Sequence, residues 1–539
     1  MPRQGDLPEL AAAVLQPGFV GTTAPDWVRR RLAEGLGGVA LFARNVESAA
    51  QVAALTAQLR AERPDVIVAI DEEAGDVTRL ESRHGSSRPG NLALGAVDDI
   101  AVTEAVAHDL GLDLASAGVT LNYAPDTDVN SNPDNPVIGV RAFGADAQLV
   151  ARHGAAFVAG LQRAGVAACA KHFPGHGDTS VDSHHAVPVI DRSRAELDAC
   201  ELLPFRAAIA AEVQAVMTGH LLVPAWDPEL PATLSRRILT GLLREELGFT
   251  GLIVTDGIEM RGVRRRYGLA GAAVLALAAG ADAICVGGDH ADEETAVRLR
   301  DAIVAAVRAG DLSEERLHDA ASRVRRLAAW TTAARPGNPS GTNPTGIPGP
   351  GHDRPGAGGA PARGGRTDGA GAVTGSAVGF AAARRAVKVT VRAQAPVLPL
   401  TEAPHVVEFA PPRNIAVGLE TPWGVGGPLA ELLPGTTAVR LDADDLAGVP
   451  DPAAVVLADA GARPLVLVVR DAHRHPWVAE ALAHTLTVRP DAIVVEMGVP
   501  VAISGGVHVA TYGATRACGL AAAQVIAGTS VSAPEPVAA

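Results

Sequence analysis

Residues 166–185 read VAACAKHFPGHGDTSVDSHH, an apolar run followed at once by a loop that carries four histidines, one lysine and two aspartates. Pro174, Gly175 and Gly177 prevent this loop from forming a helix, and the apolar residues before it are expected to form a buried strand. The polar groups therefore emerge at the carboxyl end of a strand. In α/β folds this is where ligands bind and where catalytic side chains lie.

Similar apolar runs recur through the first 330 residues and alternate with helical patterns such as Ser48–Ala61, Ile100–Ser116 and Asp146–Ala164. Eight β/α repeats predict an α/β fold, a (β/α)8 TIM-like barrel over residues 1–330, and a doubly wound sheet is the alternative. The expected strands are Pro17–Gly21, Gly38–Phe42, Val66–Ile70, Val119–Ala124, Val166–Ala170, Val213–Met217, Leu252–Thr255 and Ala283–Val286.

The composition changes sharply after this region. Residues 331–377 are mostly Gly, Pro, Ala, Arg, Ser and Thr, which predicts a flexible linker because such a segment can bury little apolar surface. A second pattern in residues 378–539 predicts a smaller α/β sandwich domain with a parallel sheet. Its expected strands are His405–Phe409, Ala438–Leu441, Leu465–Val469, Ala492–Glu496 and Val507–Ala510. No P-loop and no GxGxxG after a strand occurs in either domain, so the usual phosphate and dinucleotide fingerprints are absent.

The composition also bears on partners and location. The chain has 539 residues and a formal net charge of -14, which argues against nucleic acid as a partner. No apolar stretch is long enough to span a bilayer and the N-terminus leads into no signal sequence, so we expect no membrane partner and a cytoplasmic location. The scattered cysteines are expected to be reduced core residues rather than disulfides or metal ligands.

Charged residues follow several of the expected barrel strands. A barrel gathers the carboxyl ends of its strands around one mouth. Carboxylates together with cationic and imidazole groups suit a neutral, polyhydroxylated ligand, because charged hydrogen bonds to hydroxyls are strong and fix orientation. The residues expected around this mouth are Asp71, Arg141, Lys171, His172, His220 and Asp256.

Asp256 has two interpretations. It follows the apolar run Leu252–Thr255 and precedes Gly257, so its carboxylate is expected to lie close to the ligand, where it could attack an anomeric carbon as a nucleophile. Aspartate is also a favoured N-cap residue, and capping of the next helix is the structural alternative.

The histidine-rich loop has two interpretations as well. His172 with His176, or His176 with His184 and Asp182, could ligate zinc, although Pro174 excludes the helical histidine spacing of zincins. A proton-transfer pair is favoured, because Asp182 stands two residues before His184. A carboxylate partner fixes the tautomer of an imidazole and raises its basicity.

These residues resemble the bacterial β-N-acetylglucosaminidases of glycoside hydrolase family 3, in their two-domain form. Lys171–Gly177 followed by Asp182-Ser183-His184 is similar to a highly specific signature of that subgroup. Asp71–Leu80, Asn135–Gly144 and Leu243–Met260 resemble its other motifs. The likeness is strong over about residues 10–330 and weaker over residues 378–527, which resemble the second domain of the family.

The resemblance implies a retaining exo-β-N-acetylglucosaminidase that forms a covalent glycosyl–enzyme intermediate, with no metal and no cofactor. It implies Asp256 as the nucleophile and His184 as the general acid/base, oriented by Asp182. The expected carbohydrate substrates are muropeptides, as in cell-wall recycling, or chito-oligosaccharides. The residues that it implies for holding the terminal sugar are Asp71, Arg79, Arg141, Lys171 and His172.

The imidazole in the acid/base position suggests a second activity. A carboxylate there would repel an incoming anion within a few Å by on the order of 1–4 kcal/mol, whereas a neutral imidazole would not. Inorganic phosphate is therefore a possible acceptor, and the alternative function is a β-N-acetylglucosaminide or β-glucoside phosphorylase. An alternative of another class is an inactive sugar-binding protein.

Three features stand apart from this pattern. Asp76 occupies a place where the family has a cation near its sugar pocket, which affects the expected fine specificity. Glu496 ends a strand of the second domain, which supplies a catalytic glutamate in glucan-cleaving relatives; a purely structural carboxylate is the other interpretation. The polar strand end from Asp471 to His475 is a candidate contact for a longer substrate or for a neighbouring subunit.

Overall fold

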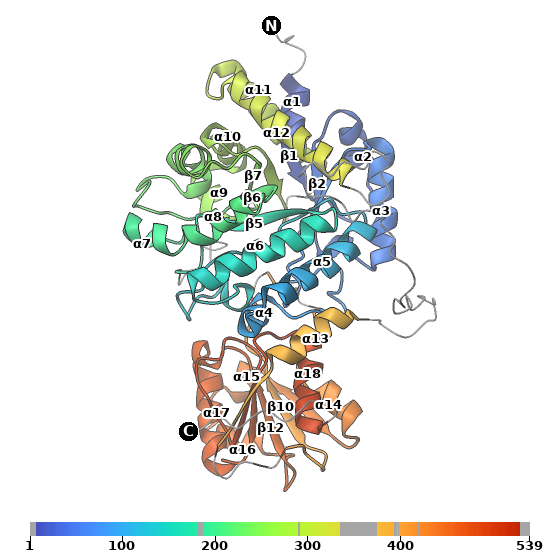
Figure 1. The fold of residues 1–539 in the computed structure, drawn as a ribbon, viewed down its shortest axis with the longest axis vertical. Coiled ribbons are helices and arrows are strands. Elements are labelled where there is room, and N and C mark those ends of the chain that lie inside the picture. Colours follow the sequence, from blue (N-terminus) through green and yellow to red (C-terminus); the bar gives the residue numbers. More distant parts are fainter. Residues whose placement is uncertain are drawn as a thin grey trace, which may run out of the picture.

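The computed structural model of the chain consists of two α/β parts, a larger one in blue to yellow and a smaller one in orange to red (Figure 1). It describes residues 7–179, 187–288, 291–334, 375–392, 396, 398–414, 416–418 and 420–528. Among the described helices, none combines the length and the apolar character needed to cross a membrane.

The larger part contains all eight strands expected from the sequence. Their bounds are β1 (Leu15–Pro17), β2 (Gly38–Leu41), β3 (Ile67–Ile70), β4 (Leu121–Asn122), β5 (Ala167–Phe173), β6 (Ala215–Thr218), β7 (Leu252–Thr255) and β8 (Ile284–Val286). The first strand shares only Pro17 with the expected strand Pro17–Gly21, because Leu15 to Pro17 are the residues that pair with the three residues of β8.

These strands close into a ring. Strands β2 to β7 form a parallel sheet in chain order. A bridge between Val254 and Ala283 connects β7 to β8, β8 pairs in parallel with β1, and β1 packs against β2. This order is that of a (β/α)8 barrel and confirms the predicted fold class.

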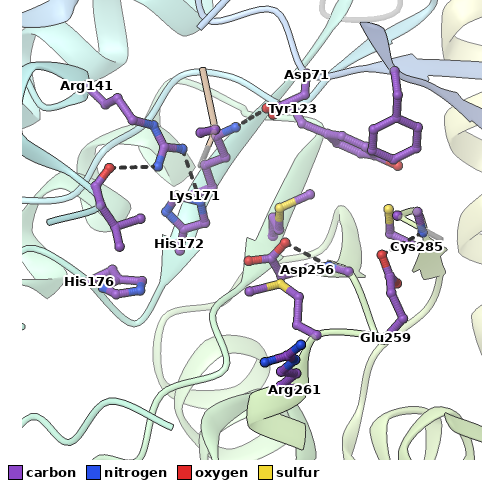
Figure 2. A pocket seen from close by; sticks show the side chains of 18 of the residues that line it. Asp71, Tyr123, Arg141, Lys171, His172, His176, Asp256, Glu259, Arg261 and Cys285 are labelled. Carbon is purple, nitrogen blue, oxygen red and sulfur yellow. Dashed lines mark hydrogen bonds and ion pairs between the residues drawn. The ribbon is translucent and has the colours of Figure 1, made fainter. Parts of the chain in front are cut away.

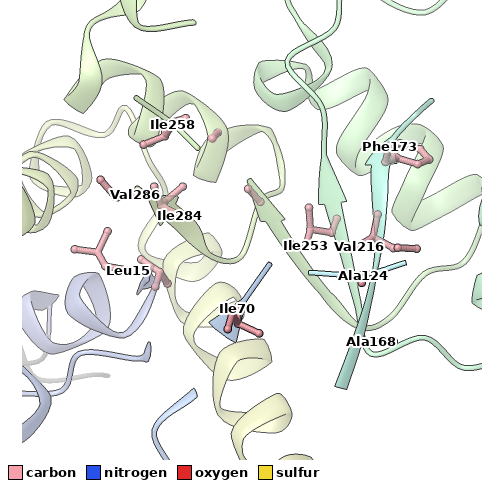
Figure 3. Packing of buried hydrophobic residues seen from close by; sticks show 14 of the residues in the cluster. Leu15, Ile70, Ala124, Ala168, Phe173, Val216, Ile253, Ile258, Ile284 and Val286 are labelled. Atoms are coloured by element: carbon pink, nitrogen blue, oxygen red, sulfur yellow. The ribbon is translucent and has the colours of Figure 1, made fainter. Parts of the chain in front are cut away.

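The barrel has one closed end. The inward side chains near the strand starts include Ile67, Ala167 and Leu252, and they pack against Leu327 and Trp330 of helix α12 (Glu314–Ala333). The outward side chains pack against the surrounding helices, and Figure 3 shows part of this second core. With the amino ends of the strands covered by α12, the carboxyl ends are left to form a binding site.

The surrounding helices start where the sequence supplies caps. Side chains of Ser48, Asp99, Asp146, Asp292 and Ser313 accept hydrogen bonds from first-turn amides of the long helices α3, α5, α6, α11 and α12. The remaining bounds are α1 (Leu7–Ala13), α2 (Asp26–Ala33), α3 (Ala49–Glu62), α4 (Asn91–Val97), α5 (Ile100–Ser116), α6 (Ala147–Arg163), α7 (Arg194–Ala199), α8 (Leu202–Ala210), η4 (Arg237–Glu246), α9 (Arg261–Tyr267), α10 (Leu269–Ala279) and α11 (Glu293–Ala309).

The smaller part is a three-layer sandwich, as the sequence predicts. Its sheet has the order β11-β10-β12-β13-β14-β9. The bounds are β9 (Lys388–Val391), β10 (His405–Phe409), β11 (Thr437–Leu441), β12 (Leu465–Val469), β13 (Ile493–Glu496) and β14 (Val507–Ala510). The sequence analysis missed β9, which pairs antiparallel with β14. Its residues are exposed or half-buried, and Lys388 and Thr390 alternate with its two valines, so no continuous apolar run marks it.

Helices cover both faces of this sheet. Helices α13, α14 and α18 pack on one face, and α16 and α17 pack on the other with the short α15 beside them. Their bounds are α13 (Ala377–Ala386), α14 (Gly426–Leu432), α15 (Ala443–Leu446), α16 (Pro452–Val456), α17 (Pro476–Val488) and α18 (Arg516–Ala527).

Helix α13 connects the two parts. It packs against α4 and α5 of the barrel on one side and against α18 of the sandwich on the other (Figure 1). The expected linker, residues 331–377, is also shorter at both ends than predicted. Helix α12 continues to Ala333, because Trp330 and Thr331 are buried, and α13 begins at Ala377. Residues 335–374 lie outside the described part of the chain.

Candidate active site

A cavity of about 550 Å³ opens at the carboxyl ends of the barrel strands. In Figure 2, Asp71, Lys171, Arg141 and His172 gather on one side of it, Glu259 and Cys285 lie on the other, and Asp256 lies between them. All five residues that the sequence analysis expected to hold a sugar line this cavity, and so does Asp256. The lining residues used below also include Phe42, Arg44, Tyr123, Val137, His176, Met217, Met260, Arg261, Arg264 and Ala416.

Asp71 holds two cations at the cavity wall. It follows β3, and its Oδ1 pairs with Nζ of Lys171 from the end of β5. Its Oδ2 lies 3.1 Å from Nη2 of Arg79. Because both cations are fixed by one carboxylate, their remaining N–H groups are held in defined directions and are suited to bind hydroxyl oxygens.

Glu73 is a buried partner that the sequence analysis did not identify. Its two oxygens accept hydrogen bonds from Nη2 and Nε of Arg141, at 2.7 and 2.9 Å, and Oε1 lies 2.6 Å from Nζ of Lys171. Burial raises the pKa of Glu73, but the charges of Arg141 and Lys171 outweigh burial and hold the pKa well below its usual range. Asp71 and Glu73 thus bracket Lys171 and orient the cationic wall.

Asp128, which lies in the loop after β4, organises the histidine loop. Its Oδ2 lies 2.7 Å from Nδ1 of His172, and its Oδ1 accepts hydrogen bonds from the backbone amides of His172 and His176. Burial lowers the pKa of His172, but the charge of Asp128 outweighs it and the net pKa is raised. Nδ1 therefore donates to Asp128, which leaves Nε2 of His172 to face Arg141 and the cavity.

His176 plays a different part from His172. It is almost completely buried, its Nδ1 lies 2.8 Å from Oγ1 of Thr179, and its ring packs edge-on against the ring of His172 at 5.9 Å. Burial lowers the pKa of His176 to about 4, so the ring is neutral near pH 7. These contacts hold the ring of His176 in place within the loop.

Asp126, Asp128 and His172 form a group whose potential ligand atoms lie within 4.8 Å of one another. This is a different set from the histidines considered in the sequence. A cation already sits beside it: Nη2 of Arg141 lies 3.6 Å from Oδ2 of Asp126. Burial, and then repulsion from Asp128, raise the pKa of Asp126 to about 8. Within this group, Asp128 with His172 forms the charged pair.

Asp256 lies on the turn that follows β7. Its amide donates to the carbonyl of Thr218 at 3.1 Å, and its Oδ1 accepts from the amide of Gly257 at 2.7 Å. The helix-capping interpretation of Asp256 is wrong, because the next helix, α9, begins only at Arg261 and is preceded by Met260. The half-buried carboxylate instead faces the cavity (Figure 2).

His220 does not belong to the cavity wall, contrary to expectation. It is completely buried, and its Nε2 donates to the carbonyl of Gly257 at 2.9 Å while its Nδ1 lies 2.8 Å from Oγ1 of Thr233. His220 therefore positions the turn that carries Asp256 and does not itself face the ligand.

Glu259 is a second carboxylate of the cavity that the sequence analysis left without a role. Its Oε1 accepts from the amide of Gly287 at 3.0 Å, and its Oε2 is buried and has no hydrogen-bond partner among the described residues. Burial, and less strongly the charge of Asp256, raise its pKa. Its position three residues after Asp256 on the same turn was the available sequence signal, since short turns bring such residues to one site.

His184 and Asp182, the expected general acid/base and its orienting partner, lie outside the described residues. The structure describes the chain up to Thr179, which contacts His176, and again from residue 187. The roles of His184 and Asp182 stay predictions from the sequence.

The smaller part of the protein completes the cavity rim. Nη1 of Arg79 donates to the carbonyl of Ala416 at 3.0 Å, and Ala416 itself lines the cavity. Nδ2 of Asn414 donates to the carbonyl of Val137, another lining residue, at 2.6 Å. The sandwich domain therefore lies beside the cavity and contributes Ala416 to its lining.

Comparison with known proteins identifies the family. The profile of the Glycosyl hydrolase family 3 N terminal domain matches residues 22–327, more than half of the chain. The chain belongs to glycosyl hydrolase family 3. This confirms the resemblance seen in the sequence.

The relatives of this family 3 protein include two with "Beta-hexosaminidase" in their names. It is 36% identical over 317 residues to Beta-hexosaminidase A of Pseudoalteromonas piscicida, a match that covers 54% of this chain and 53% of that one. It is 40% identical over 266 residues to a Beta-hexosaminidase of Pseudomonas aeruginosa, covering 49% and 78% of the two chains. The chain thus spans about half the length of the Pseudoalteromonas relative.

One solved structure resembles both parts of the family 3 protein. A glycoside hydrolase family 3 beta-N-acetylglucosaminidase from Paenibacillus sp. str. FPU-7 aligns with a TM-score of 0.80 and 32% identity, over 97% of this chain and 96% of that one. A Beta-glucoside phosphorylase, BglX, aligns with a TM-score of 0.72 at 17% identity, which indicates a shared fold only.

Asp76, the departure from the family pattern, does not face the sugar-binding wall. It is buried, its Oδ2 lies 2.6 Å from Nη2 of Arg470, and its Oδ1 accepts from the amide of Ala514. Both partners belong to the sandwich domain. Asp76 therefore has a structural role in place of the expected effect on sugar specificity. Its carboxylate connects the two domains through the ion pair with Arg470 and the hydrogen bond from Ala514.

Replacing Asp76 with alanine is expected to destabilise the contact between the domains. The change leaves the mostly buried Arg470 without its carboxylate, and breaking a buried ion pair from one side costs about 3–5 kcal/mol. We expect a lower midpoint of thermal unfolding, measured by calorimetry. Arg385→Ala is the control, because Arg385 also pairs across the domains, with Asp99, but on the exposed surface. An equal loss in both variants would contradict the role given to Asp76.

Glu496 does not reach the cavity either. Its Oε1 accepts hydrogen bonds from the amides of Asp471 and Gly498, and it is buried within the sandwich domain. The catalytic interpretation of Glu496 is therefore wrong and the structural one holds. The polar strand end beside it lies at the domain interface, where His473 contacts the carbonyl of Pro133 in the barrel domain.

Proposed function

We propose that the protein is a retaining exo-β-N-acetylglucosaminidase that releases terminal β-linked N-acetylglucosamine through a covalent glycosyl–enzyme intermediate. The observation that carries this proposal is the cavity itself. A wall of hydrogen-bonding groups fixed by Asp71 and Glu73 stands on one side, and the carboxylate of Asp256 projects into the same space. Family membership and the Beta-hexosaminidase relatives support the choice of reaction.

The terminal sugar would lie against the cationic wall. Lys171, Arg79 and Arg141 donate hydrogen bonds to its hydroxyl and acetamido oxygens, and Nε2 of His172 adds a further group. The carbonyl of Ala416 and its hydrogen bond to Arg79 close the rim at this side. A closed rim beside the terminal sugar accounts for exo action, because the rest of the glycan could extend only away from the rim.

The first chemical step would be attack by Asp256. One oxygen of its carboxylate bonds to the anomeric carbon while the bond from that carbon to the glycosidic oxygen breaks. His184 gives its proton to the departing oxygen, so the leaving group departs as an alcohol. The amide of Gly257 donates a hydrogen bond to Oδ1 of Asp256. This hydrogen bond fixes the orientation of the carboxylate and so the direction of its attack.

The second step would reverse the proton transfer. The neutral His184 takes a proton from water as the water oxygen bonds to the anomeric carbon, and the bond to Asp256 breaks. The sugar leaves with its original anomeric configuration. Asp182 would orient the ring of His184 throughout.

The proposed natural substrates are muropeptides or chito-oligosaccharides. Muropeptides and chito-oligosaccharides both end in β-linked N-acetylglucosamine, and the cavity volume accommodates one sugar with part of the next. A cytoplasmic location and a part in cell-wall recycling stay predictions from the sequence.

The test of the proposed function compares two aryl glycosides. We expect 4-nitrophenyl N-acetyl-β-glucosaminide to be cleaved with kcat/KM at least about tenfold above that for 4-nitrophenyl β-glucoside, because loss of the acetamido group leaves buried donors unpaired. Both are measured by release of nitrophenol. Faster cleavage of the glucoside would contradict the substrate assignment, and no cleavage of either would contradict the enzyme assignment.

Phosphate is expected to compete with water for the intermediate. A neutral His184 does not repel the anion, so millimolar phosphate should convert part of the product into N-acetylglucosamine 1-phosphate. Product analysis by mass spectrometry with phosphate, and with chloride at equal ionic strength as a control, measures this. Free sugar as the sole product in both samples would show that water alone is the acceptor.

A further inference from the structure

A second cavity, of about 700 Å³, lies between the two domains. It adjoins the candidate active site, and Arg141 lines both cavities. The other charged and imidazole groups of its lining are Asp76, Arg413, Arg470, Asp471, Arg474 and His475. Five of these six residues come from the sandwich domain, and Asp76 comes from the barrel domain.

A thin wall separates the two cavities. Val137 and Ala416 line the active-site cavity, whereas their neighbours Ile138, Asn414 and Val417 line the second one. Asn414 joins the two segments of the wall by donating to the carbonyl of Val137. A ligand in the second cavity would therefore lie behind the sugar-binding wall and would not occupy the place of the sugar.

The second cavity has more positive than negative charge. Arg470 pairs with Asp76 at 2.6 Å, which satisfies one cation. Arg474 lies 3.8 Å from Asp471, beyond hydrogen-bonding distance, and Oδ1 of Asp471 is already used by the amide of Val499. Four arginines thus line a cavity that contains two aspartates. Glu73 compensates Arg141 from outside the cavity, and Arg474 pairs only loosely with Asp471.

In the described part of the chain, no carboxylate forms an ion pair with Arg413, although the charges of Glu420 and Asp76 act on it from farther away. Its Nη1 donates to the carbonyls of Gly418 and Thr421, which orients the guanidinium without neutralising it. Burial first, and then the charges of Arg470 and Arg440, lower the pKa of Arg413. A bound anion would relieve this repulsion, because it would place a negative charge among the guanidiniums.

We propose that this interdomain cavity is a binding site for a phosphate group, held by Arg413 and Arg474. Guanidinium groups match tetrahedral oxyanions with paired N–H donors, and they stay charged at all physiological pH values. His475 lines the same space and can add one hydrogen bond. The cavity is larger than a free phosphate ion requires, so it has room for a small molecule that carries the group.

Ligand titrations followed by thermal unfolding test this site. The probes are inorganic phosphate and glucose 6-phosphate, each compared with sodium chloride at the same ionic strength. A ligand that binds only the folded state raises the unfolding midpoint in a saturable way. We expect such a rise with at least one phosphate probe and not with chloride. If glucose 6-phosphate saturates the shift at a lower concentration than phosphate does, the site binds a phosphate group that is carried on a small molecule. If phosphate saturates it at the lower concentration, the site binds the free ion.

A pair of variants locates the binding. Arg413→Gln with Arg474→Gln is expected to raise the half-saturating concentration at least about tenfold, because two charge-assisted contacts are lost. The matched control replaces Arg298 and Arg308, two exposed arginines on α11, with glutamine and keeps the wild-type titration. Arg474→Gln alone serves if the double variant does not fold, and about a threefold rise is expected from it.

Turnover of the aryl N-acetylglucosaminide separates this site from the active site. Arg474→Gln is expected to cleave the substrate at the wild-type rate, since Arg474 does not line the active-site cavity. The absence of any saturable shift beyond that of chloride would overturn the proposal, and so would an unchanged titration in the variant. Wild-type protein that binds phosphate here but cleaves no glycoside would instead contradict the proposed function.

Discussion

Replacing Asp256 with alanine is expected to lower kcat/KM for 4-nitrophenyl N-acetyl-β-glucosaminide by on the order of 10⁴-fold or more. Without its carboxylate the enzyme has no group to form the covalent intermediate. The fold should persist, because Asp256 is only half-buried and caps no helix. Circular dichroism and binding of free N-acetylglucosamine check that the loss concerns chemistry.

Chemical rescue provides the control for this variant. A small anion such as azide can enter the space left in Asp256→Ala and attack the anomeric carbon from the face that the carboxylate would use. The expected product is the α-glycosyl azide, which is opposite in configuration to the substrate. Unchanged turnover in Asp256→Ala would end the glycosidase assignment, and a β-azide product would place the nucleophile elsewhere.

Replacing Glu73 with glutamine is expected to give the largest loss of stability among single substitutions at the site. Glu73 compensates both Arg141 and Lys171, and all three are buried. Removing one partner from a buried charge network costs about 3–5 kcal/mol. Because the two cations also lose their fixed positions, kcat/KM should fall by about 10–100-fold. Urea denaturation and steady-state kinetics measure the two effects.

The stabilising effect of Glu73 has a defined pH dependence. The pKa of this carboxyl group is held below its usual range in the folded state. Its contribution is therefore fully present above the unfolded-state pKa of about 4.3 and is lost as pH falls below that value toward the folded pKa. The difference in unfolding free energy between wild type and Glu73→Gln should be constant from about pH 5 to 8 and should shrink below about pH 4.

Glu72→Gln is the matched control for Glu73→Gln. Glu72 is the adjacent residue and is equally buried, but it accepts hydrogen bonds from Thr78 and from the backbone amides of Arg79 and Leu80. It has no ion-pair partner among the described residues, and burial raises its pKa to about 7. We expect a smaller loss with the pH dependence of the opposite sign. Equal losses in the two variants would show that burial and hydrogen bonding, rather than charge compensation, explain the effect of Glu73.

The strands of the barrel could be predicted because each is a short apolar run followed by polar residues. Ile67–Ile70 before Asp71, and Leu252–Thr255 before Asp256, are local patterns that need no knowledge of the rest of the chain. The edge strand Lys388–Val391 was missed, because Lys388 and Thr390 interrupt its two valines. Exposure alone is not the reason, since the opposite edge strand, Thr437–Leu441, is also exposed but was predicted from Ala438–Leu441.

The same rule explains which site residues were found. Asp71 and Asp256 follow strands directly, and Lys171 and His172 lie among the last three residues of β5. Parallel strands in a barrel bring such positions to one mouth. His220 satisfied the same pattern but turned away from the mouth, since its ring is held by Thr233 and by the Gly257 carbonyl. Position after a strand determines the end of the barrel at which a residue lies, but not the direction of its side chain.

The sequence by itself determined the repeat pattern, the fold class and most of the residues around the mouth, because these depend on local alternation of apolar and polar residues. Only the tertiary structure decided which charges meet. Glu73 and Arg141 are 68 residues apart, and Asp76 and Arg470 are 394 apart. Such pairs depend on how distant segments pack, and one sequence carries no signal of that packing. For this reason Asp76, expected near the sugar, proved to join the two domains.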